Sequence, residues 1–122
     1  MQTEHGFEQG LIAAETIVQT RHPATALICA SDYLALGALR GLVKHGVKVP
    51  QDMSIISFND NDFAAFTVPS LSTVRLPIRE VGCKAGHYLL DCLGEPLGED
   101  EYLLEPTLKA RESSAPVRAR TL

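Results

Sequence analysis

The chain has 122 residues and a mass of 13.2 kDa, which is enough for one domain at most, or for a piece of one. Hydrophobic residues make up 45% and charged residues 21% of it, as in ordinary globular proteins, and a chain of this length can bury roughly two-thirds of its unfolded surface. The formal net charge is -4, whereas proteins that grip phosphates normally carry a basic face, so direct binding of nucleic acid is disfavoured.

A helix and a strand are predicted in the first thirty residues. Apolar residues recur mostly every three or four positions over residues 6–20, which is the spacing of one apolar helix face. Pro23 stops this helix, because proline cannot continue a helix and restricts its neighbour. Residues 26–30 (ALICA) are apolar throughout, which indicates a strand buried on both faces, as in a parallel sheet.

The next helix is predicted over residues 33–45 and is apolar on more than one side. Either Ser31 or Asp32 can cap its first turn. Gly37 and Gly41 would let another backbone approach closely. Such a helix must bury more than its sheet-facing side. Two interpretations remain open: a tightly packed internal helix, or a helix shared between the sheet and a second subunit.

A second buried strand is predicted over residues 54–58 (SIISF), so the helix joins two parallel strands in a right-handed βαβ unit. After a turn-rich stretch, residues 71–76 look extended. Residues 78–93 have the spacing of an amphipathic helix, with Val81 and Leu89 on its apolar side.

The end of the chain has weaker patterns. Residues 102–108 are expected to be extended. The tail from Ser113 carries no apolar periodicity and is expected to fray.

Cysteine usage and hydropathy indicate a cytoplasmic protein. Cys29, Cys83 and Cys92 are odd in number, share no C-x-x-C spacing and lie among apolar residues, as small buried thiols do in a reducing compartment. The first residues have neither the basic start nor the apolar run of a signal peptide. No apolar stretch approaches the roughly 20 residues needed to span a bilayer, so no membrane contact is expected.

Polar side chains follow both buried strands, where each strand ends. Ser31 and Asp32 follow the first strand, and Asn59 and Asp60 follow the second. Ligands of open parallel sheets bind outside the carboxyl ends of the strands, and sugar hydroxyls need paired donors and acceptors. The alternative is structural: Asp32 caps its helix, and Asn59 and Asp60 turn the chain. The structural role is favoured for Asp32 and the ligand role for Asn59.

Metal binding and catalysis are not supported by any spacing. The run from Asn59 to Asp62 gathers oxygen ligands but lacks the glycine and glutamate of an EF-hand loop, and the histidines lack metal-ligand spacing. No nucleophile elbow or serine-histidine-acid arrangement can be placed. We therefore expect no metal, no cofactor and no enzymatic activity.

Four segments in fixed order resemble the lactose-repressor/galactose-repressor (LacI/GalR) family of transcription regulators. They are CASDYLALGALR at 29–40, GVKVPQDMSIISFND at 46–60, PSLSTVRLP at 69–77 and LLEPTLKARESS at 103–114. The resemblance covers about residues 6–114. It implies a fold like the type I periplasmic sugar-binding proteins, in which two α/β subdomains hold the ligand in the cleft between them.

By this resemblance the chain is an incomplete α/β, parallel-sheet fold of the periplasmic-binding-protein-like (type I) class, mostly its C-terminal subdomain. Residues 1–76 are assigned to that C-terminal effector subdomain. Residues 77–105 are assigned to a helix and strand of the N-terminal subdomain, residues 106–114 to a return strand and residues 115–122 to a flexible tail. The family's helix-turn-helix and most of its N-terminal subdomain are expected to lie outside this chain.

The resemblance also assigns roles to single residues. Ser31 takes the place of an effector contact that is often asparagine, and Asn59 that of an aspartate that holds sugar hydroxyls. An amide makes weaker hydrogen bonds than a carboxylate, so the effector is left open between a sugar and a nucleoside. The helix at 33–45 and the segment at 63–69 match parts of the family's two-fold interface, which implies a homodimer with an isologous patch. The implied contact residues are Leu36, Leu39, Val43, Phe66 and Thr67.

Three functions are compatible with these observations. The first is the effector-binding, dimerising part of a LacI-type regulator, in which closure of the cleft alters DNA-reading heads in an N-terminal domain outside this chain. The second is a fragment of a periplasmic sugar-binding transport protein, and the third is a remnant that only dimerises. The dimer-type helix and the lack of a signal peptide favour the first.

Overall fold

A four-stranded sheet organises this computed structural model, which describes residues 6–20, 24–93 and 103–117. In spatial order the strands are β1 (Ala26–Ile28), β2 (Ser54–Phe58), β3 (Ser72–Arg75) and β4 (Thr107–Lys109). The first three strands are parallel, and β4 runs antiparallel to β3. The predicted parallel-sheet α/β fold is therefore confirmed.

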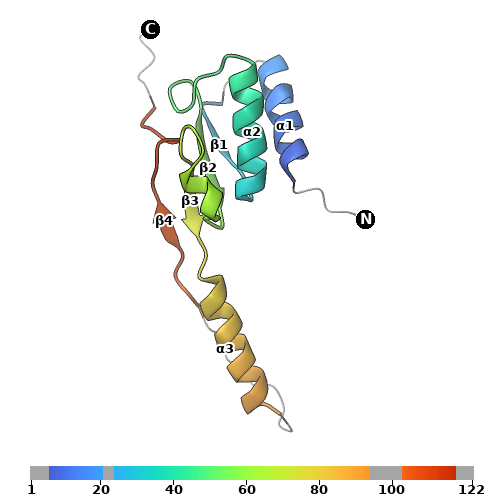
Figure 1. The fold of residues 1–122 in the computed structure, drawn as a ribbon, viewed down its shortest axis with the longest axis vertical. Helices are drawn as coiled ribbons and strands as arrows, with labels where there is room; N and C mark the ends of the chain where they lie inside the picture. Colours follow the sequence, from blue (N-terminus) through green and yellow to red (C-terminus); the bar gives the residue numbers. More distant parts are fainter. Residues whose placement is uncertain (1–5, 21–23, 94–102, 118–122) are drawn as a thin grey trace.

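The helices agree closely with the periodicity of the sequence. They are α1 (Phe7–Gln19), α2 (Asp32–Lys44), the 3-10 helix η1 (Asp62–Ala65) and α3 (Ile78–Asp91). Helix α2 connects β1 to β2 as the predicted βαβ unit, and α1 lies beside it on the same side of the sheet (Figure 1). No helix within the described ranges is both long and apolar enough to cross a membrane.

The contact between α1 and α2 explains why α2 is apolar on more than one side. A Cβ added to Gly37 would lie 1.9 Å from the carbonyl oxygen of Phe7, and one added to Gly10 would lie 2.1 Å from that of Leu34. Side chains larger than hydrogen do not fit between backbones this close. The second layer against α2 is thus a helix of its own chain, as the internal-helix interpretation supposed.

The apolar core lies between α2 and the sheet. Its largest fully buried apolar side chains are Leu42, Ile55 and Leu71. Leu39 belongs to the same cluster and is only 5% exposed. The prediction that Leu39 forms part of a dimer surface is therefore wrong, because its side chain packs inside its own chain.

The prediction that β1 is buried on both faces is also wrong. Leu27 packs against the core, whereas Ala26 and Ile28 are exposed, Ile28 by 77%. The register places Ala26 beside Ser54 and Ile28 beside Ile56, on the sheet face that carries neither α1 nor α2. An unbroken apolar run cannot distinguish a strand covered on both faces from one covered on a single face.

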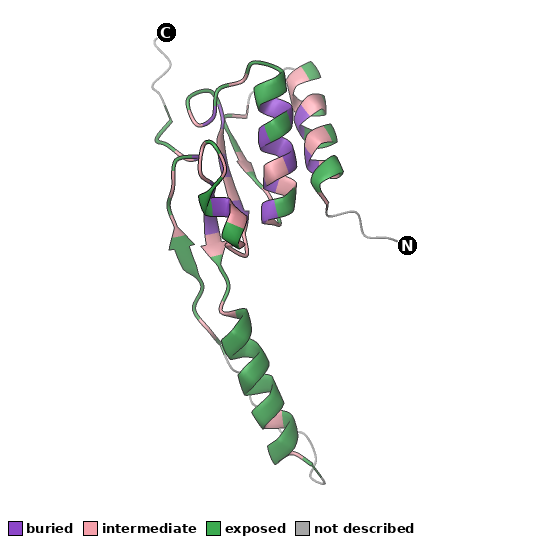
Figure 2. Cartoon of the chain, in the orientation of Figure 1, coloured by how far each residue is buried: buried purple, intermediate pink, exposed green. Residues whose placement is uncertain are grey.

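Helix α3 extends away from the sheet and buries none of its residues (Figures 1 and 2). Val81 and Leu89, on its predicted apolar side, are 51% and 59% exposed. The boundary predicted between residues 76 and 77 falls between the end of β3 and the start of α3. The strand expected before residue 106 is not seen over residues 103–105, and residues 94–102 lie outside the described part of the chain.

The segment after β4 does not fray at Ser113, contrary to the prediction. Ser113 is fully buried; its Oγ donates to the carbonyl oxygen of Ile55 (2.7 Å) and accepts from the backbone N–H of Ser72 (2.8 Å). The backbone N–H of Ala115 donates to a serine hydroxyl of β2 (3.1 Å). Three hydrogen bonds thus anchor a segment that has no apolar pattern. Residues 118–122 of the predicted tail lie outside the described residues.

Candidate functional site

The carboxyl ends of β1, β2 and β3 meet at one edge of the sheet. Ser31 and Asp32 follow β1, Asn59 and Asp60 follow β2, and Arg75 ends β3. Because these strands pair in parallel, all five residues come to the same edge. The predicted convergence of the two polar pairs is therefore confirmed.

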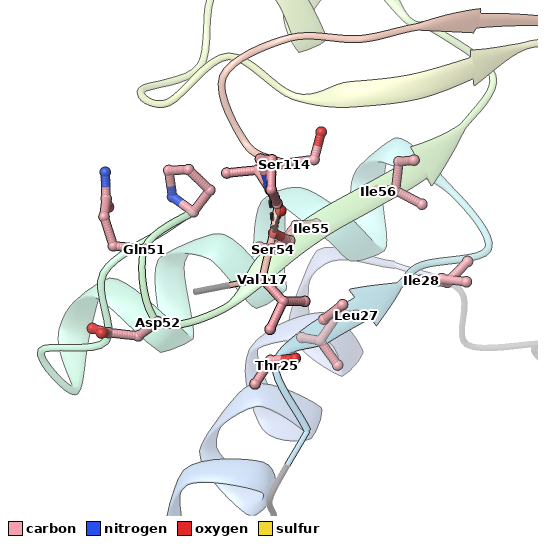
Figure 3. A pocket seen from close by; sticks show the side chains of 14 residues that line it. Thr25, Leu27, Ile28, Gln51, Asp52, Ser54, Ile55, Ile56, Ser114 and Val117 are labelled. Carbon is pink, nitrogen blue, oxygen red and sulfur yellow. Dashed lines mark hydrogen bonds between the residues drawn. The ribbon is translucent and has the colours of Figure 1, made fainter. Parts of the chain in front are cut away.

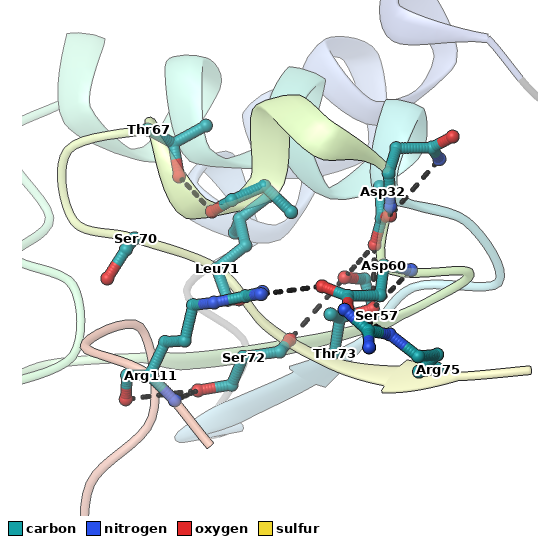
Figure 4. A network of polar contacts seen from close by, with 12 residues as sticks. Asp32, Ser57, Asp60, Thr67, Ser70, Leu71, Ser72, Thr73, Arg75 and Arg111 are labelled. Carbon is teal, nitrogen blue, oxygen red and sulfur yellow. Dashed lines mark hydrogen bonds and ion pairs between the residues drawn. The ribbon is translucent and has the colours of Figure 1, made fainter. Parts of the chain in front are cut away.

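Asp32 is the centre of a buried network. It has no exposed surface, and its Oδ1 accepts from the hydroxyls of Ser57 (2.5 Å) and Thr73 (2.8 Å) (Figure 4). Its Oδ2 accepts from the backbone N–H (2.6 Å) and the side-chain amide (3.1 Å) of Asn61. Four donors satisfy a group whose burial without partners would be costly. Asp32 thereby ties α2 to β2, β3 and the loop after β2.

This network gives Asp32 a structural role. With no exposed atom it offers a ligand nothing to bind, which agrees with the structural role favoured from the sequence. The helix cap, however, is made by Ser31 and not by Asp32. Ser31 has extended backbone angles, and its Oγ accepts from the backbone N–H of Leu34 (3.3 Å).

Asp60 is enclosed by two arginines. Its side chain is 2% exposed; Arg75 Nε donates to one carboxylate oxygen (2.6 Å) and Arg111 Nη2 to the other (2.6 Å). Arg111 also donates to the carbonyl oxygen of Leu71 (2.8 Å). Burial raises the pKa of the Asp60 carboxyl, but the hydrogen bonds and charges of Arg111 and Arg75 outweigh it, so this pKa is held below its usual value.

The two arginines were not singled out from the sequence. Arg75 stands near the end of the extended segment predicted over residues 71–76. Its positive charge, at the end of a strand that neighbours the strand before Asp60, is the sequence feature that could have indicated the ion pair. Arg111 lies 51 residues from Asp60 along the chain. Only the antiparallel pairing of β4 with β3 brings it there, and that pairing leaves no local pattern in the sequence.

Asn59 differs from its neighbours because its side chain makes no hydrogen bond within the described part of the chain. Its backbone has a φ of 103°, in the left-handed region that asparagine tolerates better than most residues. Its backbone N–H donates to the carbonyl oxygen of Val74 (3.0 Å), which places it beside the end of β3. The side chain is half-buried and makes no hydrogen bond to any other residue that the structure describes.

An aromatic pair stands at the same end of the sheet. The rings of Tyr33, in the first turn of α2, and Phe63, in η1, have centroids 5.1 Å apart and are tilted by 53°. Tyr33 is 53% exposed. The pair adds an apolar surface close to the polar edge, because Tyr33 directly follows Asp32.

The remaining dimer candidates are accessible to different degrees. Phe66 is 83% and Val43 51% exposed, and Leu36 is half-buried. The hydroxyl of Thr67 donates to carbonyl oxygens within its own turn, so it shapes the turn as well as lying near its surface. Val68 is 89% exposed; it lies in the segment at 63–69 but is not among the implied contact residues.

Two hollows lie elsewhere. One, of about 340 Å³, is formed by β1, β2 and residues 114–117 on the sheet face without helices (Figure 3). It reaches Thr25 and Gln51 at the amino ends of the strands, so it is not the predicted ligand site. The other, of about 580 Å³, runs along α3 between Leu76 and Tyr88.

The chain matches the family model described as a periplasmic binding protein-like domain over residues 2–114. It is 34% identical over 104 residues to the probable HTH-type transcriptional repressor ExuR of Bacillus subtilis, covering 85% of this chain and 31% of that protein. It is 38% identical over 109 residues to the HTH-type transcriptional repressor CytR of Escherichia coli, covering 88% and 32%. The chain thus spans about a third of the length of the curated relatives it matches.

Solved structures give the same picture. A LacI family transcriptional regulator from Enterococcus faecalis with bound ribose superposes with a TM-score of 0.84 at 29% identity, covering 97% of this chain and 44% of that one. A LacI family transcriptional regulator from Lactobacillus casei with bound sucrose superposes with a TM-score of 0.76 at 28% identity, covering 90% and 41%.

Proposed function

Since the chain belongs to the periplasmic binding protein-like domain family and, within it, to the LacI/GalR transcription regulators, we propose that it is the effector-binding, dimerising part of such a regulator. The family resemblance stated from the sequence motifs is confirmed by these matches. The observation that carries the proposal is the edge where the carboxyl ends of three parallel strands meet, with the unoccupied amide of Asn59 at its centre.

The geometry divides the four predicted ligand residues into two kinds. Asn59 and Ser31 are the proposed direct contacts, since both lie at the edge and retain some exposed surface. Asp32 and Asp60 are positioning residues, because Asp32 holds the loop after β2 from inside and Asp60 holds it from the β3 side. The loop that presents Asn59 is thereby fixed at two points before any ligand arrives.

The same contacts suggest how binding is transmitted. The segment that follows β3 and the segment that precedes β4 run side by side between the sheet and α3 (Figure 1). Arg75 ends β3 and Arg111 follows β4, and both are held by Asp60 in the loop that carries Asn59. A ligand that moves this loop therefore acts on both strands at once. We place the division between residues 1–76 and 77–105, with the return over 106–114, at this point, as a hinge between two subdomains.

Dimerisation is proposed through α2 and the turn after η1. Phe66 and Val68, both more than four-fifths exposed, are the most exposed apolar residues of the proposed surface, to which Leu36 and Val43 of α2 also belong. Light scattering at high concentration should report a dimer. Phe66→Ser should shift it to monomer, whereas Leu103→Ser, which changes an equally exposed side chain near α3, should leave it a dimer. Monomer alone for the unaltered chain would refute this part.

Ligand binding is tested by titration. Ribose, sucrose and a nucleoside are added to the isotope-labelled chain, and amide chemical shifts are followed. Shifts confined to residues 31–33 and 59–61 support the proposal, and Asn59→Ala should weaken binding about tenfold, the loss of one to two hydrogen bonds. Gln51→Ala, an exposed amide at the other end of the sheet, is the matched control. If no shift appears at the edge, the ligand role is wrong and the dimerisation-only reading takes its place.

The regulator is favoured over a transport protein because the curated relatives cited above are HTH-type transcriptional repressors. We accordingly propose that it acts in the cytoplasm, without enzymatic activity, and reaches DNA only through a helix-turn-helix that is separate from the residues described here.

A further inference from the structure

The edge at the carboxyl ends of the strands carries no free carboxylate among the residues that directly follow β1 and β2. Asp32 accepts four hydrogen bonds and has no exposed surface. Asp60 accepts from two guanidinium groups, and its side chain is 2% exposed. Asp62, the next acidic residue, is exposed in the first turn of η1. The carboxylates that directly follow β1 and β2 are therefore engaged inside the protein, whereas Asp62 is exposed.

The groups that remain are mainly hydrogen-bond donors. The side chain of Arg75 is 56% exposed, and its contacts to Asp60 are made by Nε and Nη2 and not by Nη1. Asn59 lies next to it, because the backbone N–H of Asn59 is bonded to the carbonyl oxygen of Val74. Its amide offers two N–H groups and one carbonyl oxygen, and it carries no negative charge.

One cationic side chain of this cluster is largely exposed. Asp60 carries one negative charge and pairs with Arg75 and Arg111, which carry one positive charge each, while the buried Asp32 and the exposed Asp62 add two negative charges to the edge. Arg75 is the more exposed of the two arginines, at 56% against 21% for Arg111. Arg75 is therefore the cationic group on the open side of the cluster, beside Asn59.

We propose that the effector of this chain is an anionic sugar or nucleoside derivative, whose carboxylate or phosphate binds between Arg75 and Asn59. The proposal rests on the proposed effector site. A carboxylate or phosphate accepts charge-assisted hydrogen bonds, about twice as strong as neutral ones, and fits the planar fork of a guanidinium. The hydroxyl groups of a neutral sugar need acceptors as well as donors, and the two carboxylates nearest to Asn59 along the strand ends, Asp32 and Asp60, are already bonded within the protein.

Matched pairs of ligands test the proposal. The chain is titrated at low salt with galacturonate against galactose, and with ribose 5-phosphate against ribose, by calorimetry and amide shifts. At least one anionic ligand should bind about tenfold more tightly than its neutral counterpart, the effect of one added charge-assisted contact. A larger gain in affinity for galacturonate over galactose identifies a carboxylate as the bound group. A larger gain for ribose 5-phosphate over ribose identifies a phosphate.

Two variants assign the preference to the named residue. Arg75→Gln should abolish the difference in affinity between the anionic and the neutral ligand of each pair. Lys48→Gln removes the same charge from an exposed position in the connector before β2 and should change nothing.

The failures of the two proposals are distinguishable. If neutral and anionic ligands bind equally, with shifts at Asn59 and no effect of Arg75→Gln, the anionic effector is refuted and the sugar-binding site stands. If no ligand of either kind shifts residues at the edge, the effector site is refuted and this inference falls with it.

Discussion

The glycines between α1 and α2 give the sharpest test of the fold. In Gly37→Ala the new Cβ would lie 1.9 Å from the carbonyl oxygen of Phe7 and 2.9 Å from the backbone nitrogen of Leu11. Both atoms belong to the backbone of α1, so no side chain can rotate away. Helix α1 must move by about 1 Å or more to restore ordinary contact, and overpacking of this kind costs typically about 1–3 kcal/mol.

The sign of the effect is not obvious without the structure. Alanine is favoured over glycine inside a helix by about 1 kcal/mol, so propensity alone predicts a gain in stability. Because the clash is with backbone, we take the upper part of the overpacking range, about 3 kcal/mol, and expect a net loss of about 2 kcal/mol. For a chain of 122 residues that corresponds to a fall in Tm of roughly 8 °C.

Urea denaturation followed by circular dichroism at 222 nm measures this loss. Gly82→Ala is the matched control, because the same change in α3 meets no atom within 4 Å and should be neutral or stabilising by up to about 1 kcal/mol. If Gly37→Ala unfolds at the same urea concentration as the unaltered chain, or at a higher one, then α1 does not lie against α2 as described.

Three further predictions concern single side chains. Asp32→Ala should lower the free energy of unfolding by about 3–5 kcal/mol, because it leaves several buried donors without an acceptor; equal stability in urea would contradict the network. The pKa of Asp60 is lowered on folding, so its ion pairs stabilise the chain above its unfolded pKa near 3.8, and that contribution is lost as the pH falls through the lower folded value. In Asp60→Asn the free energy of unfolding should therefore fall less steeply below about pH 4 than in the unaltered chain. The same pH dependence in both proteins would refute the ion pairs. Burial raises the pKa of the Cys29 thiol to about 11, so a thiol reagent at pH 8 should modify Cys29 slowly and the exposed Cys83 quickly, with Cys83→Ser removing the fast phase.

The helices and the buried strands were predictable because periodicity is a local property of the sequence. The apolar repeat of residues 6–20 and the runs at 26–30 and 54–58 each identify one element, and the short link between them fixes a right-handed parallel crossover. The convergence of Asp32 and Asp60 at one edge followed from that topology alone.

The remaining features depend on contacts between distant segments. The burial of Ser113 rests on hydrogen bonds to residues 41 and 58 positions away, and no apolar pattern marks it. Leu39 and Val43 lie on one helix and look alike in sequence, yet one is in the core and the other is half exposed, depending on which side of α2 faces the sheet and α1. The exposure of Ile28 likewise depends on what covers the second face of the sheet.

The exposed face and position of β1 bear on how the protein behaves in concentrated solution. β1 ends the strand order, so within the described residues its outer edge has unpaired backbone groups, next to the bare side chain of Ile28. Such an edge is a template for strand pairing between molecules. Pairing of this kind has no natural end point, unlike a two-fold contact through Phe66, which stops at two copies. Ile28→Lys should therefore suppress slow, open-ended aggregation without changing the dimer, and storage conditions can be chosen on that basis.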